Sequence, residues 1–205
     1  MNTIGFLGVP EASAEVQKMF DEDTSELGYV MNVSRLWAYQ PATVSGLFAL
    51  LGQVNSEDRL SLRQRSVLVT ACASAFGDSY CSLAWGSKLA KASDAHTAAR
   101  VLDGVDDGLS TSERATAAWA RKIALDPNRT TAEDVQELRD AGFSDSQIFT
   151  ITAFVSLRLA FSTVNDALGL RPDAALRVTA PATVRDAVTF GRPIEDEALS
   201  WPTPL

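Results

Sequence analysis

The chain has 205 residues, with 18 Lys or Arg against 26 Asp or Glu, which gives a formal net charge of −8 at pH 7. An acidic chain repels phosphate backbones, so we expect no nucleic-acid partner. One histidine (His96) and two cysteines (Cys72 and Cys81) exclude a His-rich or four-cysteine zinc site and a disulfide framework, and we expect no metal or other cofactor.

Targeting and membrane signals are missing from the sequence. No stretch reaches the roughly 18 apolar residues of a membrane span. The first residues, Met1-Asn2-Thr3-Ile4, lack the basic region of a signal peptide. We therefore expect a cytoplasmic protein with reduced thiols and no membrane partner.

Apolar residues recur three and four positions apart along most of the chain, a spacing typical of amphipathic helices. Strand-like alternation is missing, so the sequence predicts an all-α fold. The predicted helices cover about 11–27, 32–39, 42–54, 57–76, 79–92, 94–103, 111–125, 131–141 and 145–168.

Local signals mark the ends of these helices. Three starts carry a capping box, in which a hydroxyl residue is followed three positions later by an acidic or amide residue: Ser110 with Glu113, Thr130 with Glu133, and Ser144 with Gln147. Five ends carry a glycine suited to a left-handed cap: Gly28, Gly77, Gly104, Gly142 and Gly169.

The chain changes character after Gly169, where prolines become frequent: Pro172, Pro181, Pro193, Pro202 and Pro204. Only 182–190 has the pattern of another short helix. We expect one all-helical domain over 1–170. The extension over 171–205 cannot form a core of its own, so we expect it to wrap the body or a neighbouring subunit, or to be partly disordered.

Two predicted helices begin alike. Residues 60–65 read Leu-Ser-Leu-Arg-Gln-Arg and residues 109–114 read Leu-Ser-Thr-Ser-Glu-Arg, and an Ala-rich run follows each. The similarity fits either an ordinary helix start used twice or a duplicated helical unit.

The residues around Cys81 form the one group in the sequence that suggests a chemically reactive site. Gly77 ends one helix and Asp78 is the predicted N-cap of the next, so Cys81 falls in the first turn. The helix dipole there lowers a thiol pKa, whereas the Asp78 carboxylate raises it by a similar amount. The sequence leaves Cys81 as either a reactive thiol or a small buried hydrophobe, and Cys72 as a core residue.

These segments resemble the alkylhydroperoxidase D-like family, also called the carboxymuconolactone decarboxylase family, and above all its peroxidase-related branch. The resemblance runs from about residue 11 to 173. Residues 28–32, Gly-Tyr-Val-Met-Asn, are similar to the family's Gly-Tyr-Val-Pro-Asn, and 166–169 match its closing Asp-Ala-Leu-Gly. Residues 62–66, Leu-Arg-Gln-Arg-Ser, resemble its Arg-Glu-Arg-Glu helix start, and 78–81 lie where the family has Cys-x-x-Cys.

The resemblance implies an all-helical fold built from a duplicated unit, antioxidant oxidoreductase activity, and a homo-oligomer, whether dimer, trimer or hexamer. The family's catalytic pattern is Glu followed by Cys-x-x-Cys-x-x-x-His. Only its attacking cysteine is retained, as Cys81. Asp78 replaces the resolving cysteine, Trp85 the histidine and Ser66 the glutamate, while Tyr80 stands where some members have a histidine.

These departures predict a degenerate active site. Without a neighbouring thiol, a sulfenate at Cys81 cannot resolve within the motif, and without Glu and His no base activates the thiol. An N-cap carboxylate such as Asp78, if exposed, is ionised and a weak base at pH 7. An Asn-Arg pair that is common late in the family's last long helix is replaced here by Ser162-Thr163.

We therefore expect a protein that has lost two-cysteine peroxidase activity and that binds a small molecule or acts as an oligomeric partner. Two enzyme alternatives stay open: a single-cysteine peroxidase or thiol redox protein using Cys81, and a cofactor-independent lyase or isomerase acting on a small organic acid or lactone. The candidate catalytic residues are Cys81, Asp78 and Tyr80, and the candidate substrate-binding residues are Ser66 and Trp85.

Two further groups have a structural role as the favoured interpretation. Arg63 and Arg65 open a helix, where a cation is poorly placed against the dipole, so we expect them to pair with acids elsewhere. The aromatic residues Trp37, Tyr39 and Phe48 have helical spacing and are expected in the core, with the lining of an interface or a substrate channel as the alternative.

Overall fold

The structure, a computed structural model, describes residues 3–58 and 60–197. Over these residues it consists of α-helices and one short 3-10 turn, without a strand, as the sequence predicts. The helices are α1 (Ala14–Leu27), α2 (Asn32–Trp37), α3 (Pro41–Asp58), α4 (Leu62–Phe76), α5 (Ser79–Ala92), α6 (Ala95–Leu102), α7 (Thr111–Leu125), α8 (Ala132–Asp140), α9 (Asp145–Ala167), α10 (Leu176–Thr179) and α11 (Ala182–Ala187), with the 3-10 turn η1 at Pro127–Arg129.

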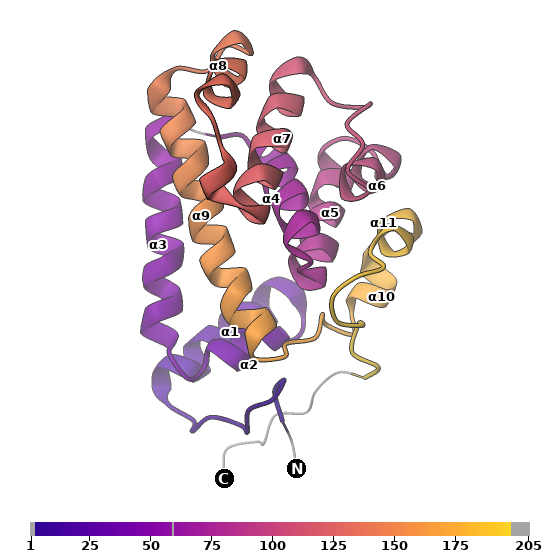
Figure 1. Cartoon of the computed structure of the whole chain (residues 1–205). Helices are drawn as coiled ribbons and strands as arrows, with labels where there is room; N and C mark the ends of the chain where they lie inside the picture. The colour runs from indigo at the N-terminus through magenta and orange to yellow at the C-terminus, as the bar shows by residue number, and fades with distance from the viewer. Residues whose placement is uncertain (1–2, 59, 198–205) are drawn as a thin grey trace.

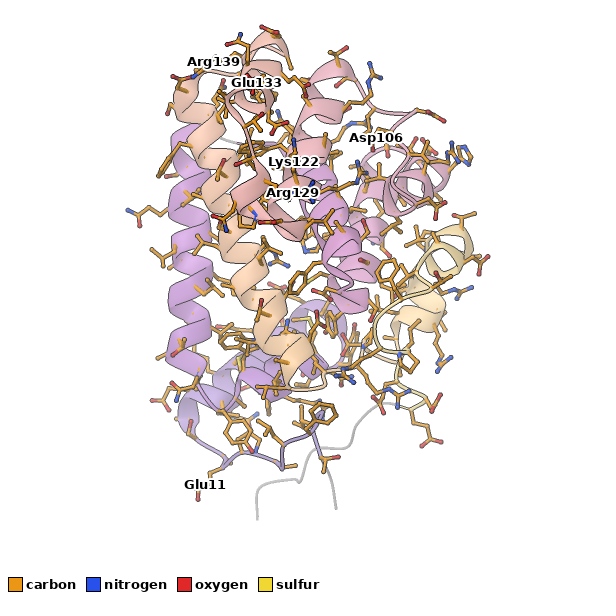
Figure 2. All side chains as sticks on the ribbon, viewed as in Figure 1. Glu11, Asp106, Lys122, Arg129, Glu133 and Arg139 are labelled. Atoms are coloured by element: carbon orange, nitrogen blue, oxygen red, sulfur yellow. The ribbon has the colours of Figure 1, made fainter. Side chains whose placement is uncertain are left out.

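The long helices α3 and α9 lie side by side along one flank of the molecule (Figure 1). Behind them α4 packs against α5, α7 and α9, and α6 and α11 cover the far side of α5. Helices α1 and α2 lie at the lower end of the molecule in the view of Figure 1. Side chains such as Glu133 and Arg139 extend from the opposite end, at α8 (Figure 2). This arrangement places the start of α5 deep inside the bundle.

Most helix starts follow their local signals. The capping boxes of Ser110 with Glu113 and Ser144 with Gln147 are confirmed. The box predicted at Thr130 is wrong by one residue, because Thr130 ends the 3-10 turn and the cap of α8 is formed by Thr131 with Asp134.

The helix predicted over 57–76 is also wrong at its start. Helix α3 continues to Asp58, and α4 begins only at Leu62. The cause is a capping box that the sequence reading did not single out: the Ser61 hydroxyl accepts from the Gln64 N–H, and the Gln64 side chain accepts from the Ser61 N–H. Helix α3 is therefore longer, and α4 shorter, than the sequence predicts.

Gly77 makes the sharp change of direction between α4 and α5. Its φ is 86°, in the left-handed region, and its N–H donates to the carbonyl of Ala73 at 3.0 Å. A residue with a side chain is strained at that φ. Because the turn takes a single glycine, Asp78 follows at once as the N-cap of α5. The other four glycines predicted at helix ends also have positive φ.

The two helices with similar starts pack against each other. Arg63, at the start of α4, donates to a carboxylate oxygen of Glu113, at the start of α7, at 2.5 Å. The expectation that Arg63 pairs with an acid is confirmed. Arg65 forms no ion pair with any described carboxylate.

The C-terminal segment lies on the body of the same chain as far as it is described. Helix α11 packs on α6 and α5. The Ser79 hydroxyl donates to the Arg192 carbonyl at 2.7 Å and accepts from the Arg192 N–H at 3.0 Å. Pro202 and Pro204 lie outside the described residues.

The core expectation holds for only one of the three early aromatic residues. Trp37 is buried, and its indole N–H donates to the Asn165 amide oxygen at 2.8 Å. Tyr39 and Phe48 are 44% and 47% exposed, which corrects the prediction. The Tyr39 hydroxyl donates to the Gly8 carbonyl at the surface, and Phe48 packs only its edge against Phe161.

Helix α9 corrects the expectation that no stretch is apolar enough for a membrane span. The helix is long and apolar enough to cross a membrane, and 44% of its most apolar 18-residue stretch is buried within the molecule. It packs against α3, α4 and α7, and it carries the buried Arg158 near its middle. These contacts are those of a core helix.

Candidate functional site

Cys81 occupies the predicted position in the first turn of α5. The Asp78 carboxylate accepts from its backbone N–H at 2.9 Å, so Asp78 is the N-cap. Asp78 is fully buried, however, and not exposed as the sequence analysis assumed. Its second carboxylate oxygen has no hydrogen-bond partner among the described residues.

The Cys81 thiol faces α9. Its residue is 2% exposed, and the sulfur accepts from Arg158 Nη2 at 3.3 Å and from the Ser162 hydroxyl at 3.7 Å. Ser162 is one of the two residues at the position of the Asn-Arg pair in the resembling family. The thiol therefore meets two donors from one face of α9.

Burial raises the pKa of the Cys81 thiol well above its ordinary value, and the charge of Asp78 raises it further. The Arg158 guanidinium acts in the opposite direction but does not overcome them. The sequence alone did not decide whether the helix dipole or Asp78 has the larger effect on the thiol pKa. In the structure, the combined effects favour the protonated thiol. Burial also raises the pKa of Cys72 to about 12, as befits a core cysteine in α4.

Arg158 is the residue that sequence reasoning missed. It is 4% exposed, its guanidinium carbon lies 5.3 Å from the ring centre of Trp85 and 5.0 Å from that of Phe161, and its Nε has no partner in the described part of the chain. A signal was present: Arg158 is the one charged residue of α9 between Asp145 and Asp166. A single cation in an otherwise apolar helix is expected to be buried. Buried charges are rare unless they are paired, so such a residue indicates a specific partner or a functional role.

Other cations lie near Trp85. The Lys88 amine is 4.2 Å from the ring centre. Its pKa is lowered by burial and then by the charges of Arg158, Arg65 and Lys91. We call Arg65, Lys88, Lys91 and Arg158 the cation cluster. Within 3–58 and 60–197, no member forms an ion pair with a carboxylate. In a chain of net charge −8, such a cluster is unusual.

Tyr80 belongs to a different network. Its hydroxyl donates to the Asp173 carboxylate, whose other oxygen accepts from the Asn32 N–H at 2.6 Å. Burial and the nearby Asp173 charge raise the Tyr80 pKa well above its usual value. The phenol is thus held by Asp173, and its hydrogen bond does not run to the Cys81 sulfur.

The two candidate substrate-binding residues differ in what their side chains do. The Ser66 hydroxyl is buried and donates to the Leu62 carbonyl of its own helix at 2.8 Å. Trp85 is half-buried, and both the Lys88 amine and the Arg158 guanidinium lie over its ring. Only Trp85 has a face directed at the cation cluster.

Asp166, near the end of α9, is a further titratable group. Burial and the charge of Asp78 raise its pKa to about 7, while Arg192 acts to lower it. The sequence singled it out only as part of a closing motif. No group of three His, Cys, Asp or Glu side chains gathers as a metal site within the described residues.

Comparisons with known proteins agree with this architecture. No family model matches the chain, and no curated protein does. Among solved structures, the core of an alkylhydroperoxidase D protein from Ralstonia eutropha JMP134, described as uncharacterized and peroxidase-related, has a TM-score of 0.74 at 23% identity over 86% of this chain and 96% of that one. A peroxidase-related protein from Silicibacter sp. TM1040 has a TM-score of 0.74 at 22% identity, covering 85% and 94%.

A third similar structure is the debrominase Bmp8, in a cysteine-to-alanine variant bound to 2,3,4-tribromopyrrole. Its TM-score is 0.68 at 18% identity, over 87% of this chain and 96% of that one. Identities this low establish a shared fold. The chain therefore has the alkylhydroperoxidase D-like fold, as its motifs led us to expect.

Proposed function

We propose that this protein binds a small organic acid beside Trp85 and has lost the two-cysteine reduction of peroxides. The observation that carries the proposal is Arg158, a cation that is 4% exposed and has no carboxylate partner among the described residues. Within the described residues, its one hydrogen bond runs to the sulfur of Cys81, which is uncharged as a thiol.

A buried cation without a counter-charge is costly, by several kcal/mol per ion in practice. The buried carboxylate of Asp78 acts on the same thiol as Arg158 but forms no ion pair with Arg158. Lys88 and Arg65 add positive charge on the Trp85 side. An anionic ligand would offset this excess of positive charge.

The ring of Trp85 indicates the shape of such a ligand. A half-buried indole beside two cations favours a flat molecule that stacks on the ring while its carboxylate reaches a guanidinium or an amine. The structure of Bmp8 with a bound bromopyrrole supports the general idea that this fold accommodates a small planar molecule.

Two features argue against the peroxide reaction. A sulfenate formed at Cys81 has Asp78 where the resolving thiol would stand, so it cannot form a disulfide within the motif. The raised pKa of Cys81 also keeps the nucleophilic thiolate scarce at neutral pH.

Calorimetry with benzoate, and with benzamide as the uncharged comparison, tests the binding. We expect benzoate to bind and benzamide to bind at least tenfold more weakly. Lys88→Gln and Trp85→Leu should each weaken benzoate binding, whereas Lys18→Gln, an exposed lysine on α1, should not. Equal binding of the two ligands, or no effect of Lys88→Gln, contradicts the proposal.

A single-cysteine redox role is the second candidate, because Arg158 and Ser162 both donate to the Cys81 sulfur and would stabilise a thiolate or sulfenate. The rate at which the Cys81 thiol of the native protein is alkylated distinguishes the redox role from the binding role. It is measured at several pH values by mass spectrometry of the Cys81 peptide. Native alkylation slower than in urea favours the binding role. Faster alkylation at neutral pH, abolished in Cys81→Ser, favours the redox role.

We also propose that the protein acts in the cytoplasm as a homo-oligomer. Exposed apolar side chains such as Phe149 (75% exposed) and Leu125 (71%) support assembly. Sedimentation velocity across a hundredfold range of concentration tests it, and a monomer throughout that range contradicts it.

A further inference from the structure

A hollow lies where α1 and α2 meet α3 and α9. One of its lining residues is Phe161, whose ring centre lies 5.0 Å from the guanidinium carbon of Arg158. The volume of the hollow is about 280 Å³, at the lower edge of the range of about 300–1,000 Å³ found for small-molecule sites. Figure 1 shows these four helices converging near the lower end of the molecule, opposite α8. The hollow is thus built from both the N-terminal helices and the long core helix.

Aromatic rings form one wall of this hollow. Trp37 and Phe161 are stacked, with ring centres 5.6 Å apart and an angle of 7° between their planes, and Phe48 meets Phe161 edge-on at 5.4 Å. Phe48 is 47% exposed although it belongs to this wall. A planar apolar ligand would cover it and bury its exposed surface.

The charged side chains of the lining are acidic, and its other polar side chains are those of Ser34 and Ser45. Glu22 and Asp23 contribute carboxyl groups, and the lining contains no Lys, Arg or His. The buried Arg35 interacts electrostatically with Asp23 and Asp173 but forms no ion pair with either. Lys18 meets Glu22 only at 3.8 Å on the exposed surface, where an ion pair is worth about 1 kcal/mol or less.

We propose that this hollow, defined by Trp37, Phe48, Phe161, Glu22 and Asp23, binds a small aromatic amine, with the ring against Phe48 and the ammonium toward the two carboxylates. This site differs from the acid-binding site beside Trp85, although the Phe161 ring that lines the hollow also contacts the Arg158 guanidinium. The charge of its lining is opposite to that of the cation cluster, so the two sites select different molecules.

Three matched probes test the proposal by calorimetry: 2-phenylethylamine, its neutral isostere 2-phenylethanol, and the anion 3-phenylpropionate. We expect the amine to bind at least tenfold more tightly than the alcohol at pH 7.5. Ser45→Trp should weaken amine binding at least tenfold, because Ser45 is exposed and lines the hollow. Ala49→Trp, exposed on the same helix, should change it less than twofold.

Glu22→Gln tests the charge without disturbing a buried group, since Glu22 is exposed. It should weaken amine binding at least threefold and leave binding of the alcohol unchanged. Lys88→Gln, at the other site, should leave amine binding unchanged. The proposal is overturned if amine and alcohol bind equally, if Ala49→Trp is as harmful as Ser45→Trp, or if Lys88→Gln abolishes amine binding. It is also overturned if Ser45→Trp instead breaks up a dimer, because a second copy of the chain then occupies the hollow.

Discussion

Asp166 shows how one buried carboxyl sets a dependence of stability on pH. Its folded pKa of about 7 lies above the ordinary 3.8, so between these values the folded state binds more protons than the unfolded state. The contribution of this group to stability therefore falls as pH rises from about 4 to 7 and then levels off. The charged form of Asp166 is unfavourable because its carboxyl is partly buried and lies near the charge of Asp78.

Asp166→Asn should remove this decline. Because the carboxyl is only half-buried, solvent screening reduces the effect, and we expect a gain of about 1–2 kcal/mol in the free energy of unfolding at pH 8. Urea unfolding at pH 4.5, 6 and 8 measures it. Asp145→Asn is the control, since Arg139 lowers the pKa of Asp145; it should show no gain at pH 8. Parallel pH profiles for wild type and Asp166→Asn would contradict this account.

Tyr80 is the sequence-predicted catalytic residue whose hydroxyl has a structural partner. Tyr80→Phe leaves one buried oxygen of Asp173 without its donor, which should cost about 1–3 kcal/mol in the free energy of unfolding. Tyr39→Phe is the matched control, because that hydroxyl donates to a carbonyl at the surface, and it should cost about 0.5 kcal/mol or less.

Denaturant unfolding at pH 7, together with benzoate calorimetry, measures both variants. Tyr80→Phe should bind benzoate like the wild type. A variant that keeps its stability but loses ligand binding would instead return Tyr80 to the binding or catalytic machinery.

At the scale of elements, Glu113 has two tasks at the joint between α4 and α7. It accepts from the Ser110 N–H at 2.9 Å within its own capping box, and it pairs with Arg63 of α4. Glu113→Gln keeps a side-chain acceptor for the cap and removes the ion pair, which should cost about 1 kcal/mol or less. Glu113→Ala removes both and should cost about 1 kcal/mol more.

Thermal and urea unfolding of the two variants distinguish the tasks. Arg63→Ala should resemble Glu113→Gln, because it removes the same ion pair and leaves the cap intact. If Glu113→Ala and Glu113→Gln are equally unstable, the capping box contributes nothing measurable to α7.

Element boundaries were predictable where the signal is local. The residues Gly77, Asp78 and Ser110 turn or cap their helices through bonds that span at most four positions, so the sequence contains everything needed to foresee them. The start of α4 after Ser61 and the choice of Thr131 over Thr130 are also set by capping boxes. These boundaries were missed because other candidate starts lie within a few residues of each box.

At the scale of the whole molecule, the C-terminal segment is held against the start of α5 by a close backbone approach. Gly191 has a φ of 68°, and a Cβ there would lie 2.6 Å from the Gly77 carbonyl oxygen and 2.9 Å from Ser79 Cβ. Gly191→Ala should therefore release the segment, since neither the φ nor the space suits a side chain.

Hydrogen exchange of the Arg192 amide, which donates to the Ser79 hydroxyl, measures the release and should accelerate at least tenfold. Gly52→Ala is the control, because open space surrounds that position in α3. It should leave the Arg192 amide unchanged and stabilise the helix by about 1 kcal/mol. Unchanged exchange in Gly191→Ala would mean that the contact does not anchor the segment.

The sequence by itself determined the all-α class, the order of the helices, most of their caps and the placement of Cys81 in a first turn, because each depends on spacing and on bonds between near neighbours. Only the tertiary structure decided that Asp78 is buried, that the Tyr80 hydroxyl turns to Asp173, and that Arg158 meets the Cys81 sulfur from 77 positions away. Burial and long-range contacts arise from the packing of whole helices, and the pKa of Cys81 depends on both. Packing therefore determines the surroundings and the pKa of Cys81, whereas local sequence determines its position in the first turn of α5.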